Sequence, residues 1–125
     1  MLLAISVGVG GFFGAILRYY LSSYFNSSLH LINIPIGTLS VNIIGSFVMG
    51  FLFALFRDIE ISEPIKLFLT TGLLGALTTY STFALETLLL LESGNISTAL
   101  FSVTLNIFGT VFAVWVGTLI YATFS

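Results

Sequence analysis

The chain has 125 residues, of which 58% are apolar and 6% are charged, and its mean hydropathy is +1.16. A soluble domain carries about a quarter charged residues, and three basic and five acidic side chains cannot cover a water-exposed surface. The composition therefore excludes an ordinary soluble fold and indicates a membrane protein. The net charge of −2 offers no basic surface to nucleic acid, and the lack of cysteine excludes disulfides and thiolate metal sites.

Four segments of the chain are long and apolar enough to cross a bilayer, which takes about 20 residues. They cover residues 2–25, 34–56, 65–91 and 96–124. The connections 26–33, 57–64 and 92–95 are short and carry Asn, Ser, Pro or Gly. His30, the single histidine, is expected to be a solvated residue of the first connection rather than a metal ligand. We predict one all-α transmembrane domain over residues 1–125.

The first span has no basic start and contains Arg18, so it is expected to be structural rather than a removable signal peptide. Small residues four apart, which let membrane helices approach closely, recur in three of the four spans. They are Gly10 and Gly14, Ser46 and Gly50, and Gly109, Ala113 and Gly117. This repetition predicts a tightly packed bundle. Because four helices enclose little interior, it also favours a homo-oligomer.

Basic residues give only a weak preference for one orientation in the membrane. Arg57 and Lys66 flank the second connection, which also holds three acidic residues, while Arg18 lies towards the other end of the first span. Two interpretations stay open. The second connection prefers the cytoplasm, or the chain inserts both ways and forms an antiparallel dimer.

Two rows of uncharged polar residues lie at depths where lipid makes them costly. Steps of four place each row on one helix face, and the rows are Thr38, Asn42 and Ser46 in the second span and Ser102, Asn106 and Thr110 in the fourth. Hydrogen bonding between helices explains such residues, especially Ser and Thr. For Asn42 and Asn106, whose amides are costlier to bury unpaired, a donor role toward a permeating ion is the stronger interpretation.

Arg18 and Glu86 are the charged residues within the spans. Arg18 lies about two turns from the end of its span, so it either extends to the headgroups or lines an aqueous vestibule that attracts anions. Glu86 lies in the last third of the third span. Both are candidate functional residues.

The third span has the strongest signal, the segment from Gly72 to Phe83 that reads GLLGALTTYSTF. Glycines followed by hydroxylic residues disfavour a continuous helix, and Thr78 lies at the centre of the span. We predict a break at the membrane midplane, where unwound backbone is tolerated only if it is buried or lines a cavity. Freed carbonyls there can bind a cation. The alternative is a continuous helix whose hydroxyls bond back to its own carbonyls.

Tyr80 and Phe83 follow the predicted break three residues apart, which makes them neighbours if the helix resumes. An aromatic ring has a positive edge, which can face a small anion. Such a pair more often serves packing. Beside a row of Asn, Thr and Ser residues, it becomes a candidate anion-binding group.

Three segments together resemble the Fluc (CrcB) family of fluoride channels. They are GGFFGAILRY at residues 10–19, GTLSVNIIGSF at 37–47 and GALTTYSTF at 75–83. The resemblance extends over the full chain. It implies passive fluoride efflux across the bacterial inner membrane by an antiparallel, dual-topology homodimer of multi-pass chains.

The resemblance also implies a structural sodium ion at the dimer centre, bound by the backbone carbonyls of Gly75 and Thr78 from both subunits. The fluoride pathway it implies includes Asn42, Tyr80 and Phe83, with the hydroxyls of Ser81 and Thr82 nearby. We add Thr38, Asn106 and Thr110 from the two polar rows as candidate pathway residues, and Arg18 and Glu86 as candidate vestibule or electrostatic residues.

The chain departs from the family pattern at two positions. Tyr80 replaces a phenylalanine and adds a hydroxyl that can donate to fluoride or obstruct the path, and Ala76 replaces a glycine. The main alternative function is a small proton-coupled multidrug exporter, which needs an acidic residue in its first span, and this chain has none there. We predict that the chain is not an enzyme, since it shows no acid–base pair or triad.

Overall fold

The computed structural model describes residues 1–29 and 33–125, so His30 lies outside the described residues. Every element within them is helical: α1 (Leu2–Ser28), α2 (Ile36–Asp58), α3 (Glu63–Leu67), the π-helix η1 (Phe68–Leu74), α4 (Gly75–Leu77), α5 (Tyr80–Glu92) and α6 (Ile96–Phe124). Four stretches are long and apolar enough to cross a membrane, the third running from α3 to α5. Their ends lie within three residues of the predicted spans.

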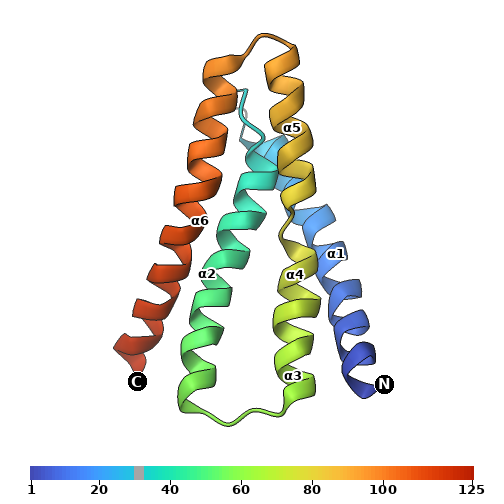
Figure 1. Cartoon of the computed structure of the whole chain (residues 1–125), viewed down its shortest axis with the longest axis vertical. Coiled ribbons are helices and arrows are strands. Elements are labelled where there is room, and N and C mark those ends of the chain that lie inside the picture. Colours follow the sequence, from blue (N-terminus) through green and yellow to red (C-terminus); the bar gives the residue numbers. More distant parts are fainter. Residues whose placement is uncertain (30–32) are drawn as a thin grey trace.

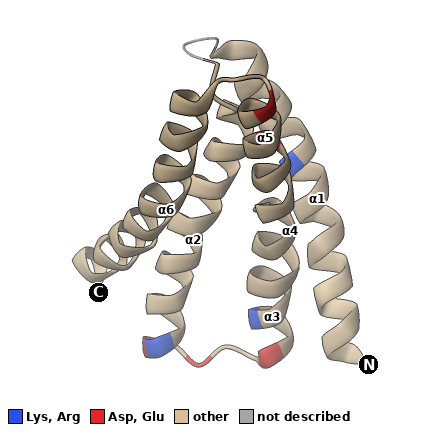
Figure 2. Cartoon of the chain, turned by 45° about the horizontal axis from the view of Figure 1, so that its top comes forward, with Lys and Arg blue, Asp and Glu red and all other residues tan. Residues whose placement is uncertain are grey.

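The chain crosses the length of the molecule four times (Figure 1). The two termini and the connection between α2 and α3 lie at the same end. Charged residues gather at that connection and are sparse along the helices (Figure 2). This distribution fits a bundle whose ends meet water and whose middle meets lipid.

Glycines bring α2 and α6, the most closely associated pair of helices, into backbone contact. A Cβ atom added at Gly117 of α6 would strike the carbonyl oxygen of Phe47, and one added at Gly50 of α2 would strike the carbonyl oxygen of Val114. The small residues seen in the sequence therefore serve packing within one chain.

Glycines also allow close backbone contact between α1 and the first half of the third span. A Cβ added at Gly10 would strike the carbonyl oxygen of Phe68, and one at Gly14 would strike that of Leu73. Both partners belong to η1, a π-helix that the sequence pattern does not predict. Isolated π-helical turns inside α-helices are common near functional sites, and this one ends at Leu74, just before the segment predicted to break.

The buried core is small. Val41 of α2, Leu74 of η1 and Leu77 of α4 form its centre, while large side chains such as Phe108 and Phe112 of α6 point outward. Apolar faces of this extent are typical of a surface covered by lipid or by another protein.

Candidate functional site

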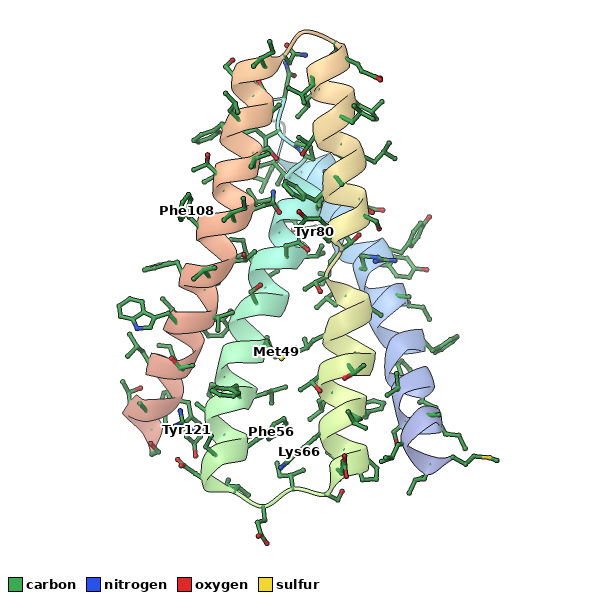
Figure 3. The ribbon with its side chains drawn as sticks, viewed as in Figure 1. Met49, Phe56, Lys66, Tyr80, Phe108 and Tyr121 are labelled. Carbon is green, nitrogen blue, oxygen red and sulfur yellow. The ribbon has the colours of Figure 1, made fainter. Side chains whose placement is uncertain are left out.

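The helix of the third span is interrupted at two residues. α4 ends at Leu77, Thr78 and Thr79 are extended with φ/ψ of −81°/155° and −148°/116°, and α5 begins at Tyr80. The side chain of Tyr80 lies beside this interruption (Figure 3). An extended segment inside a helical span loses its intrahelical hydrogen bonds, so the partners of its peptide groups decide whether it is stable.

The side chain of Asn42 on α2 supplies both partners of the Thr79 backbone. The Thr79 N–H donates to Asn42 Oδ1 at 2.8 Å, and Asn42 Nδ2 donates to the Thr79 carbonyl at 3.2 Å. Asn42 Nδ2 also donates to Asn106 Oδ1 of α6 at 2.9 Å. Because both asparagines are buried, these bonds satisfy amides that would be costly to leave unpaired.

The hydroxyl of Thr79 caps the second half of the span. Thr79 is the N-cap residue of α5, and its Oγ1 accepts from the Thr82 N–H at 3.2 Å. The same oxygen lies 3.0 Å from Thr82 Oγ1. A threonine in this position satisfies one of the free amides of a helix start, so α5 resumes directly after the break.

These two contacts occupy the amides that would otherwise bond the carbonyls of Gly75 and Thr78. In a continuous helix the Gly75 carbonyl accepts from the Thr79 N–H, and the Thr78 carbonyl accepts from the Thr82 N–H. Here the Thr79 N–H is bonded to Asn42 and the Thr82 N–H to Thr79 Oγ1. Both carbonyls predicted as cation ligands are thereby released from their helical partners.

Most of the predicted pathway residues line one groove of about 360 Å³ between α2, α6 and the break. Its lining includes Asn42, Tyr80, Phe83, Asn106 and Thr110. The Tyr80 and Phe83 rings meet edge to face, with centroids 5.5 Å apart. Phe83 is buried, whereas Tyr80 is 80% exposed. The groove thus combines aromatic edges with uncharged hydrogen-bonding groups.

A second groove of about 230 Å³ lies between α1, α2 and the start of α5. Arg18, Thr38 and Thr82 line it, and Thr79 lines both grooves. Thr38 Oγ1 donates to Glu86 Oε1 at 2.8 Å. The structure therefore places Arg18 in this groove and bonds Glu86 to Thr38, one of its lining residues. It also puts Thr38 and Asn42 in different grooves although the two share a helix face.

Three predicted site residues, Gly75, Ser81 and Glu86, line neither groove. Ser81 and Gly75 are exposed, and a Cβ at Gly75 would meet only the Thr70 carbonyl oxygen, at 3.6 Å. Sequence reasoning also missed Thr79 and Ser46 as site residues, although Ser46 lines the larger groove. Thr79 directly precedes the helix that resumes at Tyr80, and threonine is a favoured N-cap residue, which is the signal that could have identified it.

Known proteins resemble this chain over most of its length. The family model described as CrcB-like protein, Camphor Resistance (CrcB), matches residues 5–118. A protein of Sulfurimonas denitrificans named fluoride-specific ion channel FluC is 51% identical over 108 residues, which cover 86% of this chain and 83% of the relative. Proteins with the same name from Campylobacter jejuni and Shewanella pealeana are 44% and 46% identical, covering 92% and 89% of this chain and 93% and 89% of theirs.

The N-cap contact predicts a difference between two conservative substitutions at Thr79. Thr79→Ser keeps the hydroxyl that accepts from the Thr82 N–H and should unfold at nearly the temperature of the unmodified protein. Thr79→Val keeps the shape and removes the acceptor, so it should lower the free energy of unfolding by about 1 kcal/mol. Thermal unfolding in detergent micelles measures both. Equal stability of the two variants would contradict a capping role.

Proposed function

The chain belongs to the CrcB-like protein family, and on that premise we propose that it is a fluoride-specific channel through which fluoride leaves a bacterial cell passively across the inner membrane. The family match and the names of the relatives support this function. The observation that carries it on this chain is the larger groove, where uncharged donors and aromatic rings meet at the break. A channel of this kind catalyses no reaction, in line with the prediction that the chain is not an enzyme.

The chemistry of the larger groove suits a small, strongly hydrated anion. Conduction requires groups that replace the water of the ion without binding it too tightly. The Asn106 amide, one of whose two hydrogens bonds the Ser102 carbonyl, and the edges of Tyr80 and Phe83 supply partial positive charge. Among the described residues, the lining of this groove includes no Lys or Arg. A fixed cation in this groove would bind fluoride too tightly for it to be released.

The second groove serves as the access route to the first. Arg18 is the one basic residue among the described residues of its lining, and its positive charge attracts anions from water. Thr38 and Thr82 line the same groove as Arg18, and the Thr38 hydroxyl is oriented by its hydrogen bond to Glu86. Thr79 lines both grooves, so an ion that moves from the second groove to the first passes this residue.

Fluoride release from liposomes tests this function directly. Liposomes containing the purified chain should release fluoride about 100-fold faster than chloride, a selectivity that corresponds to about 2.7 kcal/mol. Tyr80→Phe keeps the ring edges and should retain fluoride release, whereas Tyr80→Ala should lose about tenfold. Ion-selective electrodes follow both ions. Equal rates for the two halides, or no fluoride release from the Tyr80→Phe protein, would contradict the proposal.

Two copies of the chain form the channel as an antiparallel, dual-topology homodimer. In a single chain Tyr80, Ser81 and Thr82 are exposed although they lie in the middle of a span, where polar groups at lipid-facing positions are costly. A second copy covers these groups. The weak charge bias, two basic residues against one, permits insertion in both directions.

Dual topology predicts an even labelling pattern for single cysteines, which the chain lacks in its own sequence. Ser62→Cys, in the α2–α3 connection, and Ser93→Cys, at the other end of the bundle, are both exposed positions. In cells with a permeabilised outer membrane, a maleimide that cannot cross the inner membrane should label about half of each variant. Full labelling of one variant and none of the other would establish a single orientation.

A structural sodium ion is bound where the two copies meet, by the carbonyls of Gly75 and Thr78. The donor set fits, because both carbonyls have lost their helical amide partners and unwound main-chain oxygens are typical sodium ligands in membrane transporters. When bound, the ion supplies positive charge beside the anion pathway. The chain contributes neutral carbonyl oxygens at this position, which suits a monovalent cation.

Sodium binding predicts a cation-dependent stability. Exchange of sodium for N-methylglucamine at constant chloride concentration should lower the melting temperature of the purified protein. At sodium concentrations about 100 times the dissociation constant, the loss amounts to about 2.7 kcal/mol. Melting curves recorded across a sodium titration provide the measurement. Identical curves in the two cations would argue against the site.

A further inference from the structure

A chain of side-chain amide hydrogen bonds runs from α6 to the break in the third span. Asn106 Nδ2 donates to the Ser102 carbonyl of its own helix at 3.0 Å. Asn106 Oδ1 accepts from Asn42 Nδ2 at 2.9 Å, and Asn42 Oδ1 accepts from the Thr79 N–H at 2.8 Å. The backbone of α6 is thus connected to the Thr79 peptide through two buried carboxamides.

This chain of bonds fixes the orientation of both carboxamides. A carboxamide has donors on its nitrogen and acceptors on its oxygen, so a flip exchanges the two. The Ser102 carbonyl requires the nitrogen of Asn106, which leaves its oxygen to face Asn42. Asn42 must then present its nitrogen to Asn106, which turns its oxygen toward the Thr79 N–H. The bond from Asn106 therefore holds Asn42 in the same orientation that the Thr79 N–H and carbonyl require.

The donors of Asn42 are all used in this arrangement. Its nitrogen carries two hydrogens, one directed to Asn106 Oδ1 and the other to the Thr79 carbonyl. With 9% of its surface exposed, Asn42 is held by three hydrogen bonds to the protein. Its main effect on the ion pathway is consequently the conformation it imposes on Thr79.

We propose that Asn106 is a positioning residue of the channel, acting through Asn42 to hold the Thr79 peptide extended. This inference rests on the proposed fluoride channel function and assigns a mechanical role to a residue of α6 within it. Removal of Asn106 Oδ1 eliminates one of the three hydrogen bonds of the Asn42 carboxamide and leaves one of its amide hydrogens unpaired, which weakens its hold on Thr79. The Thr79 N–H can then return to the Gly75 carbonyl, and the start of α5, with Tyr80, moves with it.

Two measurements on the full-length protein test the proposal. Hydrogen exchange of the Thr79 amide, followed by NMR on protein labelled with 15N-threonine in micelles, reports whether the Thr79 N–H remains bonded to Asn42. Fluoride efflux from liposomes reports conduction. Asn106→Leu has nearly the same size without the acceptor, and the matched control Thr104→Val changes an exposed residue of α6 whose hydroxyl bonds only to the Leu100 carbonyl.

The expected result is a joint change. Asn106→Leu should raise the Thr79 exchange rate and lower fluoride efflux, each by about tenfold, because a buried hydrogen-bond partner is lost. Thr104→Val should stay within about twofold of the unmodified protein in both measurements. Because Asn106 acts through Asn42, the double variant with Asn42→Leu should conduct no less than Asn42→Leu alone.

Asn106→Asp keeps the test decisive where Asn106→Leu fails to fold. Its carboxylate retains an acceptor for Asn42, so Thr79 exchange should remain within about threefold of the unmodified protein. Lower efflux from Asn106→Leu with unchanged Thr79 exchange, or multiplicative losses in the double variant, would overturn the proposal. Absence of fluoride release from the unmodified protein would instead refute the proposed function, and the exchange result would still decide whether Asn106 holds the break.

Discussion

The pairing of the Asn42 carboxamide with the Thr79 peptide is the interaction on which the rest of the site depends. A bilayer offers no water to a peptide group that leaves its helix, so an interrupted span must find replacement partners within the protein. Asn42 supplies a donor and an acceptor to the same residue. Without it, the Thr79 N–H would gain by returning to the Gly75 carbonyl, and the extended segment would close into helix.

The open break explains why such different groups gather at one place. The Thr79 side chain, freed from helical geometry, becomes the cap of α5, and the new helix begins with the aromatic pair Tyr80 and Phe83. On the other side of the break, the carbonyls of Gly75 and Thr78 lose their helical partners. The released carbonyl oxygens and the aromatic pair thus arise from a single change in backbone conformation.

The sequence allowed prediction of features that depend on local pattern. Hydropathy located four spans to within three residues, and the run of glycine and hydroxylic residues pointed to Thr78, where the observed extended segment begins. The three-residue spacing of Tyr80 and Phe83 predicted their ring contact. Each of these follows from residues within a turn or two of one another.

Contacts between distant residues remained beyond sequence reasoning. Thr38 and Glu86 are 48 positions apart and Asn42 and Asn106 are 64 apart, and no local signal joins either pair. The π-helix η1 follows from the close approach of α1 at Gly10 and Gly14, which depends on how the two helices pack. The homodimer and its sodium ion stay predictions, because they involve a second chain.

One helix, α2, positions both sides of the break. α1 packs against η1 and α4, whereas α6 packs against α5, so the two halves of the third span have different main neighbours. α2 contacts both halves: Gly45 leaves room for the Thr78 methyl group, Asn42 binds Thr79, and Thr38 bonds Glu86 of α5. These three residues lie three or four positions apart on one face of α2. A movement of α2 relative to α6 would therefore act on both halves at once, which is why backbone contacts at Gly50 and Gly117 matter for a site more than two turns away.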